Sequence, residues 1–130
     1  MIQNMKKTLL GVMVFLIAGC GNESVNNSAN RNPDIVSFTT TASKLGLGQS
    51  AILKCSATDP DGDPLSYTWE SSDGGPLDPV NAAGNEVVYT THSCCGGITE
   101  IIVTVKDNRG GNSKTGMLIE FSASFNETGE

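Results

Sequence analysis

The fold of this chain is decided by residues 51–70, which read AILKCSATDPDGDPLSYTWE. In the first part, Ala51, Leu53, Cys55 and Ala57 fall on alternate positions. In the last part, the residues at alternate positions are Leu65, Tyr67 and Trp69. Side chains of a strand point alternately to its two faces, so this spacing predicts two strands with Cys55 and Trp69 facing the core. The Pro, Asp and Gly residues between them are typical of a tight turn.

The same strand-length alternation continues on both sides of this stretch, between Pro33 and Phe121. We expect further strands near residues 35–40, 86–90, 101–105 and 117–121, and no run has the period of a helix. The chain therefore is expected to be all-β. About seven antiparallel strands are the number typical of an immunoglobulin-like β-sandwich over residues 34–121.

Two stretches carry a resemblance to a known group of domains. Residues 57–69 (ATDPDGDPLSYTW) and residues 101–111 (IIVTVKDNRGG) resemble PKD and bacterial Ig-like (cadherin-like) domains. The resemblance covers nearly the whole of residues 34–121. It departs at residues 70–75 (ESSDGG), where PKD domains usually continue with an aromatic residue and Gly-Asp-Gly. The resemblance implies an Ig-like sandwich that acts as a binding or adhesion module.

Residues 1–19 are typical of a secretory signal peptide. Lys6 and Lys7 precede an apolar run over residues 9–18, followed by small residues. As a helix this run would cover about 15 Å, roughly half of the ~30 Å hydrocarbon core of a bilayer, so it is too short for a stable membrane span.

Residues 16–20 (LIAGC) resemble the lipobox of bacterial lipoproteins. The resemblance implies cleavage before Cys20 and attachment of lipid, including palmitate-like acyl chains, to Cys20. The expected partner is then a lipid bilayer and the expected location is a membrane surface, held by the lipid anchor. Gly21 stands where an aspartate often retains lipoproteins at the inner membrane, so the outer membrane is favoured in a Gram-negative host. The alternative is an ordinary secreted protein in which a cysteine follows the cleavage site by chance.

The segments on either side of the predicted sandwich are polar. Residues 20–33 contain the lipidated cysteine and an Asn- and Ser-rich stretch, which we interpret as a flexible linker. Residues 122–130 are interpreted as a polar tail. The net charge of −6 argues against nucleic acid as a partner and is compatible with cation binding.

The acidic turn has two interpretations. Carboxylates at Asp59, Asp61 and Asp63 alternate along the chain and can converge on Ca²⁺, which takes oxygen ligands. In the domains that this chain resembles, the loop beginning at Asp107 lies at the same end of the sandwich, so Asp107 is a fourth candidate ligand. The alternative is a tight turn held by Asp side-chain hydrogen bonds, with no cation and no cofactor.

Once Cys20 is assigned to lipid, Cys55, Cys94 and Cys95 remain, an odd number for an oxidising compartment. We favour a disulfide between Cys55 and either Cys94 or Cys95, which leaves one free thiol. The alternative, a Cys94–Cys95 bridge, leaves Cys55 reduced. His92 beside the cysteine pair also offers soft ligands for zinc or copper, although adjacent cysteines are a weak signal.

No nucleophile motif or phosphate-binding glycine pattern occurs, so we do not expect an enzyme. The sequence favours a membrane-anchored lipoprotein that presents one Ig-like binding or adhesion module for a protein or polysaccharide of the cell envelope. An exposed edge strand is the expected docking site for such a fold, by strand addition. The alternative is a structural spacer without a ligand of its own.

Overall fold

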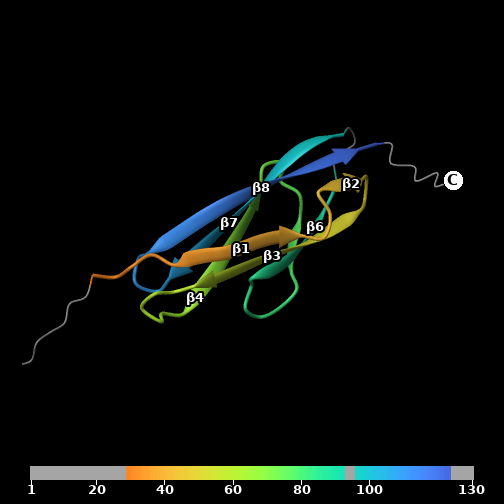
Figure 1. Cartoon of the computed structure of the whole chain (residues 1–130). Helices are drawn as coiled ribbons and strands as arrows, with labels where there is room; N and C mark the ends of the chain where they lie inside the picture. The colour runs from red at the N-terminus through yellow and green to blue at the C-terminus, as the bar shows by residue number, and fades with distance from the viewer. Residues whose placement is uncertain (1–28, 93–95, 124–130) are drawn as a thin grey trace, which may run out of the picture.

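The computed structural model describes residues 29–92 and 96–123, and these residues form a sandwich of two four-stranded sheets (Figure 1). One sheet has the order β1-β3-β6-β5 and the other the order β2-β8-β7-β4. The eight strands are β1 (Asp34–Thr40), β2 (Lys44–Gly46), β3 (Ser50–Thr58), β4 (Leu65–Ser71), β5 (Leu77–Pro79), β6 (Glu86–Thr90), β7 (Gly97–Asp107) and β8 (Asn112–Ser122).

The six strands expected from alternation are confirmed, and β6 has the predicted bounds. Two further strands, β2 and β5, were not predicted, so the count is eight and not about seven. Each has three residues, too few for an alternating pattern to be recognisable. The expectation that all strands pair antiparallel is wrong for β2, which runs parallel to β8.

The core lies between the two sheets and is filled from the strand positions that alternate inward. It contains one cluster around Leu53, Tyr89 and Ile101 and a second of Cys55, Val103 and Val105. Cys55 is fully buried, so its predicted inward orientation is confirmed. Burying an aliphatic side chain contributes about 1.5–3 kcal/mol, which makes these positions the main source of stability.

Trp69 packs against both clusters, but its side chain is only partly buried because β4 is the edge strand of its sheet. Its ring lies edge-to-face with Phe38, with a centroid separation of 5.7 Å. The indole N–H donates a hydrogen bond of 2.8 Å to the carbonyl oxygen of Gly84. The tryptophan therefore joins the two sheets at their margin.

The β3–β4 turn and the β7–β8 turn lie at the same end of the sandwich, where the chain also enters β1 (Figure 1). We call this end, formed by residues 59–63 and 107–111, the Asp-rich pole. The opposite pole includes residues 72–75, 91–92 and 96–97. No helix in the part of the chain that the structure describes is long and apolar enough to cross a membrane.

Candidate cation site at the Asp-rich pole

Asp59 organises the β3–β4 turn. Its Oδ1 accepts hydrogen bonds from the backbone N–H groups of Asp61 (2.8 Å) and Asp63 (3.1 Å). The N–H of Gly62 donates to the backbone carbonyl of Asp59, and Gly62 has a φ of 77°, which glycine adopts at little cost. The tight turn predicted from the sequence is therefore present, and it uses one of the two carboxylate oxygens of Asp59.

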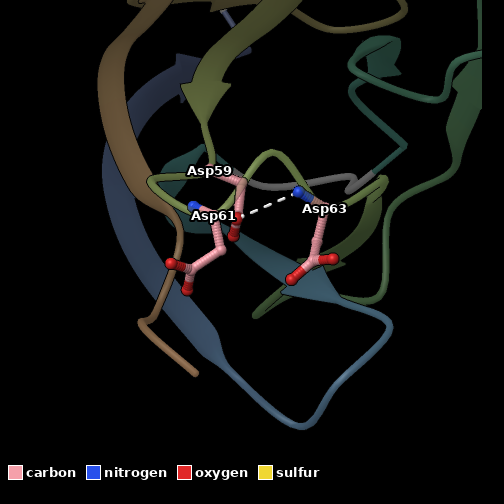
Figure 2. A group of neighbouring side chains, drawn as sticks. All are labelled: Asp59, Asp61 and Asp63. Atoms are coloured by element: carbon pink, nitrogen blue, oxygen red, sulfur yellow. Dashed lines mark hydrogen bonds between the residues drawn. The ribbon is translucent and has the colours of Figure 1, made fainter. Parts of the chain in front are cut away.

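The turn also brings three carboxylates together. One oxygen from each of Asp59, Asp61 and Asp63 lies within 4.8 Å of the others, and Figure 2 shows the three side chains projecting from the same side of the turn. Asp59 Oδ2 and Asp63 Oδ2 are buried and have no hydrogen-bond partner. Burying a carboxylate oxygen without a hydrogen-bond partner destabilises the folded state. Formation of the turn does not require these two oxygens to be buried without partners.

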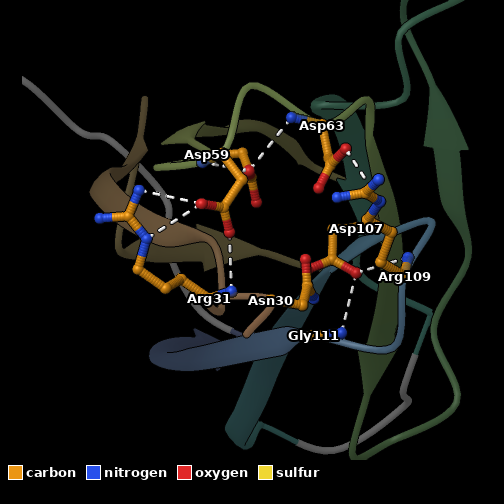
Figure 3. A network of polar contacts seen from close by, with 8 residues as sticks. Asn30, Arg31, Asp59, Asp63, Asp107, Arg109 and Gly111 are labelled. Atoms are coloured by element: carbon orange, nitrogen blue, oxygen red, sulfur yellow. Dashed lines mark hydrogen bonds and ion pairs between the residues drawn. The ribbon is translucent and has the colours of Figure 1, made fainter. Parts of the chain in front are cut away.

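Two arginines flank this cluster. Arg31 donates from its backbone N–H to Asp61 Oδ2 (2.7 Å) and from Nε and Nη2 to Asp61 Oδ1 (3.0 and 2.9 Å). These bonds, from the backbone first and the guanidinium second, hold the pKa of Asp61 below its usual range. Arg109 Nε lies 3.5 Å from Asp63 Oδ1. Figure 3 shows Arg31 and Arg109 on opposite sides of the carboxylates.

Asp107 lies at the same pole but outside the group of three. Its Oδ1 accepts the backbone N–H groups of Arg109 (2.7 Å) and Gly111 (2.8 Å), and its Oδ2 accepts Asn30 Nδ2 (2.8 Å). Burial favours the protonated acid, but these hydrogen bonds outweigh it and keep the pKa of Asp107 low. Asp107 thus shapes the β7–β8 turn, and its part as a fourth ligand stays a prediction.

The donor set fits a hard cation such as Ca²⁺, which takes about six to eight oxygen ligands. Asp59 Oδ2 and Asp63 Oδ2 are the oxygens that would hold it, because both are buried and unpartnered. The guanidinium of Arg31 would compete with a cation at Asp61, because it already donates two hydrogen bonds to Asp61 Oδ1 and carries a positive charge. Arginine and metal therefore compete at Asp61.

The residues that sequence reasoning missed are those that reach the turn from afar. Asn30 and Arg31 belong to the segment interpreted as a flexible linker, yet they bind Asp107 and Asp61 across 77 and 30 positions of sequence. The hydroxyl of Ser113 also donates to the carbonyl of Pro33 (2.6 Å). A polar, Asn-rich segment carries no periodic signal that could have indicated these contacts.

A second polar network, also unpredicted, lies at the opposite pole. Asp73 accepts hydrogen bonds from the Tyr89 hydroxyl at Oδ2 (2.6 Å) and from Thr99 Oγ1 at Oδ1 (2.9 Å). Burial favours protonated Asp73, but these bonds and one from the Gly75 N–H outweigh it and lower its pKa. Burial, and then the Asp73 carboxylate, raise the pKa of Tyr89. Because Tyr89 and Thr99 come from different sheets, Asp73 ties the sandwich together.

The predicted cysteine pairings rest on Cys94 and Cys95, which lie outside the described residues, so they stay predictions. Cys55 is a buried thiol whose pKa is raised by burial.

The metal site predicted from His92 and the cysteine pair also depends on Cys94 and Cys95. The described part is His92, whose half-exposed side chain places Nδ1 3.7 Å from Asp73 Oδ2. Cys20 and the signal peptide likewise lie outside the described residues. Their roles in lipidation and membrane location therefore stay predictions.

The sequence profile of the bacterial Ig domain family matches residues 25–119. The chain thus belongs to the bacterial Ig domain family, in agreement with the resemblance drawn from residues 57–69 and 101–111. Homologous Ig-like and PKD domains are non-catalytic modules, often with adhesion or spacer roles. No curated protein matches the chain closely enough to count as a relative.

Solved structures support the same fold. The PKD domain of an M14-like peptidase from a Thermoplasmatales archaeon is 25% identical, with a TM-score of 0.55, over 72% of this chain and 99% of that domain. The PKD1 domain of Vibrio anguillarum Epp is 20% identical, with a TM-score of 0.50, over 73% of this chain and 99% of that domain.

A nucleoside hydrolase-related hypothetical protein from Saccharophagus degradans, associated with carbohydrate metabolism, is 21% identical with a TM-score of 0.51. The match covers 72% of this chain but only 26% of that protein, so this chain corresponds to about a quarter of its length. The likeness is one of fold.

Proposed function

We propose that this protein is a lipid-anchored binding module of a bacterial cell envelope, held to the membrane through acylated Cys20 and engaging a protein or polysaccharide with its Ig-like head. The observation that carries the proposal is where the linker joins the head. Asn30 and Arg31 bind the Asp-rich pole, so an anchor at Cys20 would keep that pole nearest the membrane. The opposite pole would then point away from the membrane, toward partners.

The surface near the opposite pole offers a contact for such a partner. Ile98 on β7 and Leu118 on β8 are 66% and 61% exposed, and the register of the two strands places them as diagonal neighbours on the outer face. Neighbouring exposed apolar side chains favour contact with a protein or with the apolar face of a sugar ring. We propose no catalytic role for the domain.

Anchoring is tested by labelling cells with a fatty-acid analogue and separating their membranes. The full chain is expected to carry the label and to sediment with the outer membrane, whereas Cys20→Ser loses both. Labelling of Cys20→Ser at the level of the natural chain would contradict the anchor.

Partner binding is tested by capture from envelope extracts, with and without EDTA. Replacing Ile98 and Leu118 by Asp is expected to abolish capture, while the control Val36→Asp, at an exposed position of the other sheet, is expected to retain it. Failure of the natural chain to capture any partner in either condition would instead favour the second candidate function, a spacer. Equal capture with and without EDTA would remove a divalent cation from the binding mechanism.

We further propose that the Asp-rich pole binds Ca²⁺ through Asp59 and Asp63, with Asp61 joining when Arg31 withdraws. Supporting this are the two unpartnered buried oxygens. Calorimetric titration with Ca²⁺ is expected to give weaker binding for Asp63→Asn and tighter binding for Arg31→Ala, because the competing guanidinium is gone. If neither the natural chain nor Arg31→Ala binds Ca²⁺, the alternative interpretation stands, in which residues 59–63 form a tight turn without a cation.

A further inference from the structure

The edges of the two sheets differ in how well they are protected from pairing with another chain. Edge strands β2 and β5 have only three residues each, and β5 ends in Pro79. Edge strand β1 is interrupted by a bulge between Ile35 and Ser37. These are the common devices by which proteins block strand addition.

Edge strand β4 has none of these protections. All seven of its residues pair with β7 in unbroken register, from Leu65 opposite Asp107 to Ser71 opposite Ile101. It contains no proline, no glycine and no lysine. Within the described residues, β7 is the only strand that pairs with β4, so the backbone of its other edge pairs with no strand.

The hydrogen bonds to β7 determine which groups point to this open edge. Just beyond β4, the N–H of Ser72 donates to the carbonyl of Glu100 (2.9 Å), so even-numbered residues exchange hydrogen bonds with β7. The backbone N–H and C=O groups of odd-numbered residues therefore point away from β7. The carbonyl of Ser71 already accepts the N–H of Gly74. The donors and acceptors of Tyr67 and Trp69, at the centre of the strand, are suited to pairing with another antiparallel strand.

We propose that β4 pairs antiparallel with β4 of a second copy of this chain, about a two-fold axis at Thr68. In this register, Tyr67 lies opposite Trp69 of the second copy, and both have the outward-pointing backbone groups that the pairing requires. Thr68 lies opposite its own counterpart as a non-hydrogen-bonded pair. Cross-strand aromatic pairs and Thr pairs are both favourable in sheets.

The charges on the outer face also match in this register. Glu70 of one copy lies opposite Ser66 of the other, so no two carboxylates face each other. Lys106 is the neighbour of Ser66 on β7. Lysine and glutamate separated by two strand spacings, about 10 Å, can reach one another across a small serine. The two-fold axis creates this Lys106–Glu70 pair twice.

The result is a continuous eight-stranded sheet with the order β2-β8-β7-β4-β4-β7-β8-β2. A single strand pair buries less than the ~1,200 Å² of a standard stable interface, so the dimer is weak and forms with rising concentration. Anchoring many copies to one membrane surface would raise their local concentration. The pairing itself does not depend on the anchor.

Position 68 provides a direct test, because a non-hydrogen-bonded antiparallel pair has Cα atoms about 4.5 Å apart, within the range of a disulfide. The full chain is purified in detergent, oxidised, and examined on non-reducing gels. Thr68→Cys is expected to give a covalent dimer. The matched control is Thr104→Cys, because position 104 lies opposite Thr68 on β7, one strand away from the edge. This control is expected to give no more covalent dimer than the natural chain.

A charge exchange tests the register. Sedimentation velocity should show that Glu70→Lys weakens dimerisation about tenfold, because two attractive contacts become repulsive, and that adding Lys106→Glu restores it. Glu100→Lys, with the same change of net charge on the same sheet, is expected to have no effect. The proposal is overturned if Thr68→Cys gives no more dimer than Thr104→Cys, if Glu70→Lys and Glu100→Lys behave alike, or if the natural chain stays monomeric at millimolar concentration.

Discussion

Replacing Tyr89 by Phe tests whether the Asp73 network holds the two sheets together. The change removes one hydroxyl, and with it the 2.6 Å hydrogen bond to Asp73 Oδ2, while the buried ring stays in place. Hydrogen bonds to charged groups contribute about 1.5–3 kcal/mol. Asp73 keeps the bonds from Thr99 and Gly75, so we expect the lower half of this range.

Thermal and urea unfolding at pH 7 provide the measurement. A loss of about 2 kcal/mol corresponds to a fall of roughly 8–16 °C in the midpoint for a domain of this size. The control is Tyr67→Phe, the same deletion on a half-buried tyrosine at the edge of the sheet. Its hydroxyl faces the backbone of Ala57 and not a carboxylate, so a loss of about 0.5–1.5 kcal/mol is expected.

The pH dependence separates this explanation from simple loss of packing. The folded pKa of Asp73 is below its unfolded value of about 3.9, so its contribution is present above that pH and is lost as the pH falls through the folded pKa. The difference between Tyr89→Phe and the natural chain should therefore shrink in acid. A loss below about 0.5 kcal/mol at pH 7, or an equal loss at neutral and acid pH, would refute the reasoning.

Three further predictions follow from named contacts. Gly75→Ala would place a methyl group 2.5 Å from the Tyr89 ring and should cost about 1–3 kcal/mol in urea unfolding, so an unchanged midpoint would contradict this packing. Arg31→Ala should speed amide hydrogen exchange in residues 29–33, measured by mass spectrometry, with little change in the thermal midpoint of unfolding. Unchanged exchange would mean that the Arg31 contacts do not hold residues 29–33 on the domain. Cys55 should resist alkylation until the protein is denatured, because burial raises its pKa. Alkylation of Cys55 in the native protein as fast as in the denatured protein would show that the core is open.

Much of the fold follows from local sequence because the core strands are long enough to show alternation. Leu53, Cys55 and Tyr67 could be assigned to inward positions from spacing alone, and the bounds of β6 were predicted without error. The parallel pairing of β2 could not be predicted, since three residues carry no period. Trp69 was expected in the core, but its partial exposure follows from the position of β4 at a sheet edge, which is a property of the topology.

For the candidate site, the sequence by itself determined the Asp59–Asp63 turn, because proline, glycine and aspartate impose a tight turn through contacts only two to four residues apart. Only the tertiary structure decided what surrounds that turn. Arg31 and Arg109 come from segments far away in the chain, and they neutralise part of its charge through contacts that no local pattern encodes. The physical reason is range: backbone preferences act between neighbours, whereas ion pairs and the open edge of β4 exist only after the two sheets have assembled.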